Sequence, residues 1–492
     1  MTRNTEYPTV TGEFKDLARL ETELQLLGQS RLLRELQSST GELRQQLITQ
    51  LLSIDFSLLR EIRQTGLSNT AADRAQRAAA PTTVVRQPQS PEHHQLWQNA
   101  RSHGEELLRN GAAAVVTVAG GQGTRLGFDL PKGMFPIGPL SSRTLFQIFA
   151  EQILARRRRY AAPLPWLIMT SDATHTQTAS FFEANAFFGL GADSVFFFRQ
   201  GSLPALDAAT GEILLSAPGE LALSPDGHGG LVGALEKSGL LNWLQQHGIR
   251  HLYYHQVDNP TAIVADPALL GFHSQARAQA TTCVVCRTSP AERMGVVVDL
   301  EGRSEIIEYS ELTPEQSAAR NPAGEWIFWA GNTAIHVFEL DFLKQLTTAG
   351  SRLPLHAARK NVPFIDLHGQ LQTPSDHANP NAIKLEQFIF DALPMAHTTL
   401  IVEGHREREF NPVKNRSGSD SVDTCRAALL RIAREWLEDA GCQLPDNTHA
   451  EISPLHALDP AELKQRLHSS QLTINDLVPS SPAPPTSETS RE

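Results

Sequence analysis

The 492-residue sequence has little cysteine and no long apolar run. Four cysteines are too few for a disulfide-stabilised scaffold and are typical of a protein kept in a reducing compartment. No stretch of about 18 apolar residues occurs, so no transmembrane helix is expected. The first 15 residues are polar and lack the apolar segment of a secretory signal. These absences predict a cytoplasmic protein without a membrane partner.

The sequence also lacks an excess of basic residues. It holds 43 Lys and Arg against 54 Asp and Glu, which gives a net charge of −11 at pH 7. Non-specific binding to nucleic acid needs a basic surface, so no nucleic-acid partner is predicted. The four consecutive arginines at 156–159 are most simply explained as a solvated helix face.

Two of the cysteines, Cys283 and Cys286, have the spacing of half a zinc site. A tetrahedral zinc site would need a second pair of ligands, and Cys425 and Cys442 are too far apart in the sequence to form one. The residues around Cys283 are mostly Val and Thr, which favour strands. We therefore expect a buried strand here rather than a metal or redox centre.

The most informative residues that are present form a glycine-rich loop at 119–127, directly after an apolar run at 112–118. The loop has four glycines and Arg125, and Lys132 follows it closely. Glycine lets backbone N–H groups approach an anion, and the two cations add fixed positive charge. The pattern is neither a Walker A loop nor G-x-G-x-x-G. It predicts a loop that holds nucleotide phosphates, with a plain turn as the alternative.

Strand-like and helix-like segments alternate in the middle of the chain. This alternation predicts an α/β fold with a mostly parallel sheet, in which ligands bind beyond the carboxyl ends of strands. The glycine-rich loop lies at such an end. Strands are expected at 113–118, 166–170, 195–198, 251–257, 280–286, 295–299 and 398–402, and helices at 144–158, 176–186, 233–247, 383–392 and 424–440.

The two ends of the chain differ in composition from the middle. Residues 1–70 carry leucines at helical spacing, residues 68–92 read as a linker, and the end of the chain is rich in Pro, Ser and Thr. We expect an N-terminal helical domain plus linker over 1–95, a central catalytic domain over 96–385, a C-terminal domain over 386–475 and a disordered tail over 476–492.

Further polar residues follow apolar segments or open predicted elements. Gly227 and His228 lie in a second glycine-rich loop, which we expect to face a ligand unless it is a plain turn. Asp258 follows an apolar strand and suits either a Mg²⁺ ligand or a turn residue. Lys384 opens the helix predicted at 383–392, where the macrodipole disfavours a cation unless a phosphate is bound. A solvated lysine is the alternative.

These residues resemble a known family in their order along the chain. The sequence is similar to the eukaryotic-type UDP-N-acetylhexosamine pyrophosphorylases, which are UTP-dependent uridylyltransferases. Each motif is modest, but their joint order between about residues 20 and 440 is specific. The matching segments are 119–127, 131–133, 168–171, 198–205, 225–227, 257–259, 265–267, 295–297, 308–311, 330–332, 383–386 and 410–415.

The resemblance implies a central Rossmann-like mixed-sheet nucleotidyltransferase domain, flanked by smaller N-terminal helical and C-terminal domains. It implies that UTP and a sugar 1-phosphate react to give a UDP-sugar and pyrophosphate, with Mg²⁺ as cofactor. The implied residues are Ala119, Gly120, Gly121, Gln200 and Gly227 for the nucleotide, Arg125 and Lys132 for the triphosphate, His228, Gly295, Glu308, Tyr309 and Asn332 for the sugar, Lys384 for the sugar-linked phosphate, and Asp258 for the metal.

One residue departs from the family pattern. The N-acetylhexosamine enzymes have Asn at the position of His228, and a Gly-His-Gly step resembles the UDP-glucose and broad UDP-sugar pyrophosphorylases. The first loop, with Gln122, does not resemble theirs. The sequence predicts uridylyl transfer with N-acetylglucosamine as the sugar. A UDP-glucose or broad-specificity enzyme and an inactive nucleotide-sugar-binding protein remain alternatives, and the oligomeric state is not indicated.

Overall fold

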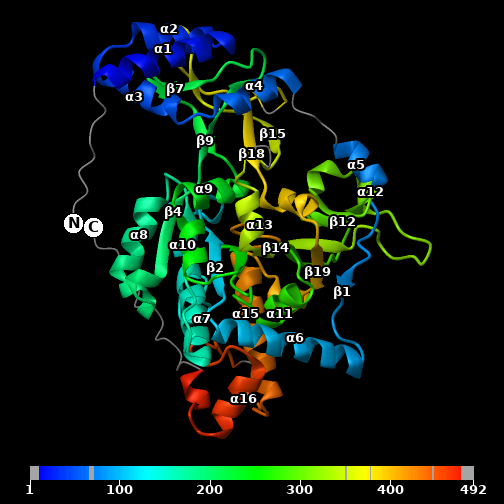
Figure 1. Ribbon diagram of the computed structural model, residues 1–492. Helices are drawn as coiled ribbons and strands as arrows, with labels where there is room; N and C mark the ends of the chain where they lie inside the picture. Colours follow the sequence, from blue (N-terminus) through cyan, green and yellow to red (C-terminus); the bar gives the residue numbers. More distant parts are fainter. Residues whose placement is uncertain (1–9, 66–70, 349–351, 377, 446–447, 478–492) are drawn as a thin grey trace, which may run out of the picture. The chain divides into compact units, whose positions relative to one another are not determined.

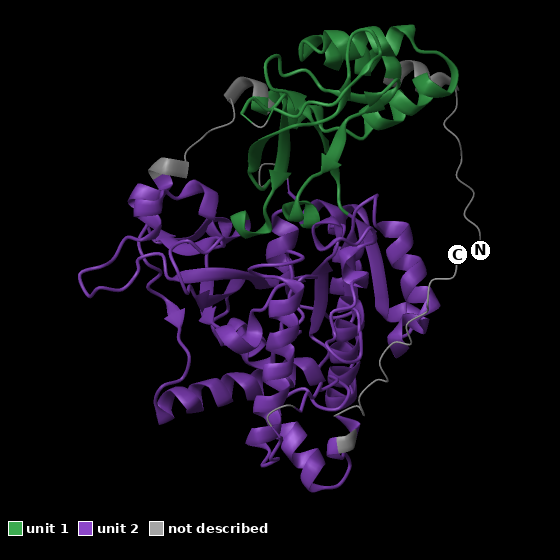
Figure 2. Cartoon of the chain, turned by 180° about the vertical axis from the view of Figure 1, so that it is seen from behind, with its two compact units in different colours: residues 1–70, 200–231, 352–391 green, residues 71–199, 232–351, 392–492 purple. Residues whose placement is uncertain are grey.

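The computed structural model describes residues 10–65, 71–348, 352–376, 378–445 and 448–477. The chain forms two compact units, each built from three segments that are separate in the sequence (Figure 2). Unit 1 comprises residues 1–70, 200–231 and 352–391, and unit 2 comprises 71–199, 232–351 and 392–492. These two units are divided at other positions than the domain boundaries predicted at residues 95, 385 and 475. Those boundaries therefore stay predictions. All but the first two residues of the predicted tail lie outside the described residues.

Unit 2 is built on a large mixed sheet (Figure 1). This sheet confirms the predicted α/β fold class. A hairpin of β12 (Val296–Leu300) and β13 (Arg303–Ile307) extends from β14. The other strands, in spatial order, are β1 (Val84–Val85), β19 (Thr399–Glu403), β11 (Ala280–Cys286), β14 (Ala330–Glu339), β10 (His251–Gln256), β2 (Ala113–Val118), β3 (Trp166–Thr170) and β4 (Val195–Arg199).

The order of the parallel strands positions the candidate site. Strands β2, β3 and β4 pair parallel in chain order, and β10 pairs parallel with the other edge of β2. The direction in which strands are added therefore reverses between β2 and β10. In open α/β sheets ligands bind at such a switch point, beyond the carboxyl ends of the two strands. Strand β14 then pairs antiparallel with both β10 and β11, which makes the sheet mixed.

Helices of unit 2 bury apolar side chains against this sheet. Phe146 and Phe149 of α7 are fully buried in one cluster with Trp166 of β3 and Tyr253 of β10. Thr144 caps α7, because its hydroxyl accepts a hydrogen bond from the N–H of Gln147. The longer helices are α5 (Ala71–Arg77), α6 (Pro91–Arg109), α7 (Leu145–Tyr160), α8 (His175–Ala184), α9 (Leu231–Lys237), α10 (Leu240–Gln246), α11 (Pro267–Gln275), α13 (Leu340–Gln345), α15 (Val422–Asp439) and α16 (Pro460–His468).

The predicted strands agree closely with the sheet. Strands β2, β3 and β11 have the predicted bounds, β4 and β10 differ by one residue at one end, and β12 and β19 are shifted by one residue at both ends. The helix predicted at 233–247 is interrupted, because Gly239 adopts a left-handed conformation (φ 74°) between α9 and α10. Glycine reaches this conformation without the steric cost that other residues have.

Unit 1 combines the N-terminal helices with short strands from two later segments. Its helices are α1 (Val10–Leu26), α2 (Ser30–Ser38), α3 (Gly41–Leu52) and α4 (Phe56–Thr65). Their buried leucines share one apolar cluster with Ile213, Leu215 and Leu385 of the strand segments. The strands are β5 (Ser202–Pro204), β6 (Leu206–Asp207), β7 (Leu215–Ala217), β8 (Glu220–Leu221), β9 (Leu223–Pro225), β15 (Leu355–Lys360), β16 (Phe364–Ile365), β17 (Leu371–Gln372) and β18 (Ala382–Gln387).

The helix predicted at 383–392 is wrong. Residues 382–387 form strand β18, and a 3₁₀ helix, Ile389–Met395, follows it. Strand β18 pairs antiparallel with β15 over its whole length and with β6 at its start. Tertiary pairing on both edges therefore overrides the local helical pattern. Lys384 lies inside a strand, so the argument from the helix macrodipole no longer applies to it.

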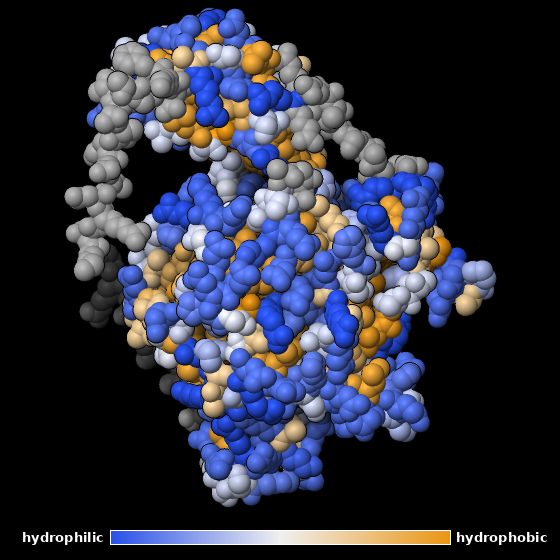
Figure 3. Space-filling view, viewed as in Figure 1, coloured by the Kyte–Doolittle hydropathy of each residue, from blue (hydrophilic) through white to orange (hydrophobic). Residues whose placement is uncertain are grey.

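Polar and apolar side chains are interspersed over the face of unit 2 that Figure 3 shows. Individual exposed leucines, such as Leu96 at 47 % and Leu130 at 37 %, are ordinary on a globular protein. Among the described residues, no helix combines the length and the apolar character needed to cross a bilayer.

Candidate active site

The first glycine-rich loop begins at the switch point of the sheet of unit 2. It leaves the end of β2, where the N–H of Ala119 donates to the carbonyl of Met169 on β3 at 2.8 Å. The hydroxyl of Ser171, just after β3, donates to the carbonyl of Gly120 at 2.8 Å. The carbonyl of Gly121 accepts from the N–H of Lys132 at 3.0 Å. Two strand ends and the Lys132 backbone therefore fix the start of the loop.

The glycines of this loop serve different purposes. A Cβ atom on Gly133 would lie 2.2 Å from the ring of Phe146, and one on Gly123 would lie 2.8 Å from the carbonyl oxygen of Phe128. Packing therefore requires glycine at both positions. Around Gly121, in contrast, no atom lies within 4 Å of the corresponding position among the described residues. The backbone of Gly121 faces open space, where a ligand can approach it closely.

Lys132 and Asp258 form an ion pair at the switch point. The ammonium nitrogen of Lys132 lies 3.1 Å from Oδ2 of Asp258, and the two side chains are only 17 % and 15 % exposed. Asp258 follows β10 and Lys132 follows the loop after β2, so neighbouring parallel strands deliver one charge each. The structure thus brings together two predicted site residues that are 126 positions apart.

A second lysine acts on the same carboxylate. Burial by itself would raise the pKa of Asp258, but the charges of Lys132 and Lys414 outweigh it and hold the pKa below its usual value. The backbone places Lys414 there, because the N–H of Val413 donates to the carbonyl of Asp258 at 2.8 Å. Asp258 therefore stays ionised at neutral pH, opposite two cations.

Arg125 is exposed on the loop, and its carbonyl accepts a hydrogen bond from the N–H of Arg416 at 3.1 Å. Backbone hydrogen bonds thus attach the segment 413–416 both to the loop after β2 and to Asp258, two residues beyond β10. The segment 410–415 is one of those that resemble the family, but no role was predicted for Lys414. A lysine directly after Val413, in a segment of mostly polar residues, is the sequence feature that could have identified it.

Three of the predicted sugar residues come together on the hairpin side of the sheet. The N–H of Asn332 on β14 donates to the carbonyl of Gly295 at 2.8 Å. A Cβ atom on Gly295 would lie 2.9 Å from Oε1 of Glu308, so glycine at this position lets that carboxylate come close to the backbone. Carboxylate and amide oxygens at half-buried positions are suitable partners for sugar hydroxyls. Tyr309, next to Glu308, is 46 % exposed.

A β-bulge positions Asn332. The pairing of β14 with β11 shifts register between Cys283 and Val284, and Ala334 opposite them has a positive φ of 57°. The Asn332 side-chain oxygen accepts from the N–H of Ala334 at 3.0 Å, which stabilises the bulge. Bulges redirect side chains at strand ends and are frequent beside functional sites.

The remaining predicted residues belong to unit 1. Gly227 has a φ of 84°, and a Cβ atom on it would lie 2.4 Å from the carbonyl oxygen of Gln387 on β18. Gln200 directly follows β4, and Lys384 pairs with Ala358 of β15. Gly227 is therefore required by backbone packing within unit 1, whatever else it does.

His228, predicted to face a ligand, is half-buried and contacts neighbouring residues of unit 1. Its Nδ1 accepts a hydrogen bond from the N–H of Ile389 at 3.1 Å, and its ring stacks on Phe388 at 5.3 Å between centroids. Burial lowers the pKa of His228 to about 4, so the ring is neutral at pH 7. This contact network gives His228 a local structural role.

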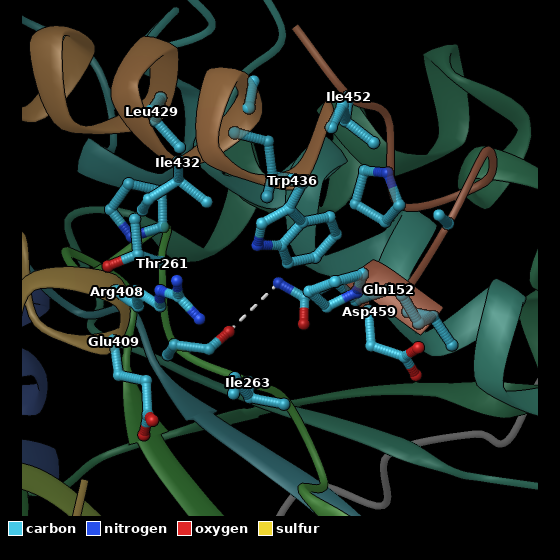
Figure 4. A pocket seen from close by; sticks show the side chains of 18 of the residues that line it. Gln152, Thr261, Ile263, Arg408, Glu409, Leu429, Ile432, Trp436, Ile452 and Asp459 are labelled. Atoms are coloured by element: carbon cyan, nitrogen blue, oxygen red, sulfur yellow. Dashed lines mark hydrogen bonds between the residues drawn. The ribbon is translucent and has the colours of Figure 1, made fainter. Parts of the chain in front are cut away.

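A cavity of about 360 Å³ lies elsewhere in unit 2. Figure 4 shows Trp436 and Ile432 of α15 on one side of it and Gln152 of α7 on another. The amide of Gln152 donates to the carbonyl of Ala262 at 3.1 Å. The predicted site residues are not among the described residues that line this cavity. Cavity size within unit 2 therefore does not identify the candidate site.

Comparison with known proteins gives a family match that spans these site residues. Residues 62–460 match the family UDPGP, described as UTP--glucose-1-phosphate uridylyltransferase. The chain belongs to this family. The predicted family resemblance and the predicted uridylyltransferase class are thereby confirmed. Enzymes of the family generally use a divalent metal ion.

Several relatives of this chain carry more specific names. It is 38 % identical to UDP-N-acetylhexosamine pyrophosphorylase-like protein 1 of Xenopus tropicalis, over 74 % of this chain and 71 % of that protein. It is 37 % identical to UDP-N-acetylglucosamine pyrophosphorylase of Saccharomyces cerevisiae, over 71 % of this chain and 75 % of that protein. The solved uridine diphosphate N-acetylglucosamine pyrophosphorylase of Trypanosoma brucei superposes with a TM-score of 0.78 at 26 % identity, covering 95 % of this chain and 96 % of that one.

Proposed function

We propose that this chain transfers a uridylyl group from UTP to N-acetylglucosamine 1-phosphate and releases pyrophosphate. The observation that carries the proposal is the largely buried Lys132–Asp258 pair at the switch point of the sheet, beside a loop whose Gly121 backbone faces open space. A polyphosphate bound there would meet Lys132, Lys414 and Arg125 together with a carboxylate able to hold a cation.

The reaction needs positioning and charge neutralisation rather than a general base. An oxygen of the sugar phosphate attacks the α-phosphorus of UTP, the bond from that phosphorus to the bridging oxygen breaks, and pyrophosphate leaves with the electron pair. The attacking phosphate is already ionised at neutral pH. We assign Arg125 and Lys132 to the triphosphate and the leaving pyrophosphate, and Lys384 to the sugar-linked phosphate.

The residues present fit a magnesium ion at Asp258. Mg²⁺ prefers oxygen ligands and often binds one or two carboxylates together with substrate phosphates. Asp258 supplies a largely buried, ionised carboxylate beside cations that can balance the phosphate charge. When bound, the ion would neutralise negative charge that develops on the phosphates. Asp258 is the residue that we expect to hold it.

Two observations support N-acetylglucosamine as the sugar. The two named relatives, which match 74 % and 71 % of this chain, carry UDP-N-acetylhexosamine and UDP-N-acetylglucosamine in their names. The packing of His228 against Phe388 and Ile389 gives its departure from the family pattern a reason within unit 1. Gly295, Glu308, Asn332 and the exposed Tyr309 are proposed to contact the sugar. Ala119, Gly120, Gly121, Gln200 and Gly227 are proposed to contact the nucleotide. The cytoplasmic location stays a prediction.

The decisive experiment measures pyrophosphate release from UTP and Mg²⁺ with three sugar phosphates in parallel. These are the 1-phosphates of N-acetylglucosamine, N-acetylgalactosamine and glucose. We expect strong preference for the acetamido sugars, because a site that hydrogen-bonds the acetamido group rejects a substrate without it. Preference for glucose 1-phosphate would replace the proposal with the UDP-glucose alternative. Release with none of the three would contradict all of these substrates.

A further inference from the structure

A second group of candidate metal ligands lies at the opposite end of β10 from Asp258. His251 is the first residue of β10 and pairs in register with Glu339, the last residue of β14. His273 lies on α11, which packs against both β11 and β14. A six-residue strand separates this group from Asp258 by about 20 Å. The group is therefore distinct from the candidate active site.

The three side chains converge at distances suited to one ion. One ligand atom from each lies within 4.8 Å of the ligand atoms of the other two. Nδ1 of His251 lies 3.5 Å from Oε2 of Glu339. Ligands at about 2.0–2.2 Å from a tetrahedral zinc ion lie roughly 3.3–3.5 Å from each other. One pair thus already has the required separation, and small side-chain rotations would bring in the third ligand.

Both histidines are buried with ring nitrogens unused by the described residues. His251 is 3 % exposed; in the described part of the chain its Nε2 has no hydrogen-bond partner, and its Nδ1 makes no hydrogen bond but faces the Glu339 carboxylate at 3.5 Å. His273 is 0 % exposed, and its Nε2 lacks a partner within the same residues. Buried polar atoms are almost always satisfied, because an unpaired one costs about 1–3 kcal/mol. The two Nε2 atoms, both buried on neighbouring rings, point to a missing partner.

The protonation of the two rings suits ligation. Burial lowers the pKa of His251 to about 4 and that of His273 to about 3, so both rings are neutral at pH 7. Nδ1 of His273 lies 2.8 Å from the hydroxyl of Thr281 on β11. If that nitrogen carries the proton, Nε2 keeps its lone pair. Metal-binding histidines are commonly oriented in this way by a partner on the other ring nitrogen.

We infer that His251, His273 and Glu339 form a site for a divalent transition-metal ion of the zinc class. Two imidazoles and one carboxylate favour zinc over magnesium, which takes oxygen ligands. The Glu339 side chain is 36 % exposed, so the fourth position can be filled by water. The ion would join the start of β10, the end of β14 and helix α11 within unit 2.

The test measures zinc binding to the full chain, not activity. The protein is stripped with a chelator and titrated with Zn²⁺ against a chromogenic chelator, and the melting temperature is followed in parallel. We expect one tight zinc ion per chain and a higher melting temperature when it binds. Co²⁺ in its place should give the visible absorption of a tetrahedral ion. Failure to take up a stoichiometric Zn²⁺ ion would overturn the inference.

Variants separate this site from adventitious binding. Glu339→Gln changes a partly exposed carboxylate and should weaken zinc affinity at least about 100-fold, while Thr281→Val should weaken it about 10- to 100-fold. His94→Gln removes an exposed histidine on α6 and should leave tight binding intact. Equal affinity in wild type and Glu339→Gln, or a loss in His94→Gln alone, would refute the site. Pyrophosphate release with Mg²⁺ should persist in Glu339→Gln, so failure of this inference would not bear on the proposed function.

Discussion

The two glycine-rich loops have similar compositions but different physical reasons for their glycines. In unit 2 the Gly121 backbone faces open space beside Lys132 and Asp258. In unit 1 Cβ atoms on Gly227 and Gly229 would lie 2.4 Å and 2.6 Å from the backbone of Gln387. The first loop is open and charged, whereas the second is packed against a strand. Glycine content alone therefore does not distinguish ligand binding from close backbone approach.

Removing the positive charge of Lys132, beside the first loop, should have the largest effect on activity. We expect Lys132→Ala to lower kcat about 100- to 1000-fold, because a buried cation aimed at developing phosphate charge is lost. Lys414 remains opposite Asp258, so the fold should persist. Pyrophosphate-release kinetics together with a melting curve make the measurement. Lys237→Ala, on helix α9, is the matched control, and an unchanged kcat in Lys132→Ala would remove Lys132 from the mechanism.

Adding a methyl group to each loop should separate binding from packing. Gly227→Ala combines a positive φ with a backbone clash, so we expect the free energy of unfolding to fall by at least about 2 kcal/mol. Gly121→Ala should change that free energy by less than about 0.5 kcal/mol and instead raise KM for UTP. Denaturant titration and UTP saturation curves test both. The reverse pattern would invert the roles of the two loops.

The buried acid of the second loop should make its stability depend on pH. Burial, the largest effect, raises the pKa of Asp226 from 3.8 to about 6. Between these two pH values the folded state holds a proton that the unfolded state loses. The contribution of Asp226 to stability is fully present below pH 3.8 and is lost as the pH rises through about 6. Asp226→Asn should stabilise the protein by roughly 1–2 kcal/mol at pH 8 and less at pH 5. The measurement compares the denaturant midpoints of Asp226→Asn and the wild type at both pH values. A difference between the two proteins that does not change with pH would contradict the raised pKa of Asp226.

The smallest effect is expected at His228. Replacing it with Asn, the residue of the N-acetylhexosamine enzymes, removes the stack on Phe388 and should cost about 1 kcal/mol of stability. The ratio of kcat/KM for N-acetylglucosamine 1-phosphate and glucose 1-phosphate should stay within about threefold, because the ring packs inside unit 1. A larger shift in that ratio would show that His228 sets sugar preference.

Local patterns predicted the sheet of unit 2 better than unit 1. Strands such as β2 and β11 are continuous runs of apolar residues and threonine, so their bounds are visible in the sequence. Strand β14 was not predicted, because its bulge at Ala334 breaks any regular pattern. Strand β18 was mistaken for a helix, because only its pairing with β15 and β6 makes it a strand.

In the candidate site, too, some residues could be identified from the sequence and others only from the fold. Lys132 and Asp258 were each identifiable from charge at a strand end, and the structure pairs them. The contribution of Lys414 depends on a backbone contact between Val413 and Asp258 that no local pattern encodes. The packing of His228 against Phe388 depends likewise on residues about 160 positions away.

The interleaved segments of unit 1 have a consequence for synthesis on the ribosome. The apolar faces of its N-terminal helices are covered partly by Ile213, Leu215 and Leu385, which lie in the second and third segments. The third segment ends about 320 residues after the first, which at about 5–20 residues per second means roughly 15–65 s of elongation. During that interval the leucines of α1 to α3 lack their final partners. Slow translation between residues 70 and 391 should therefore favour chaperone binding or aggregation of the nascent chain.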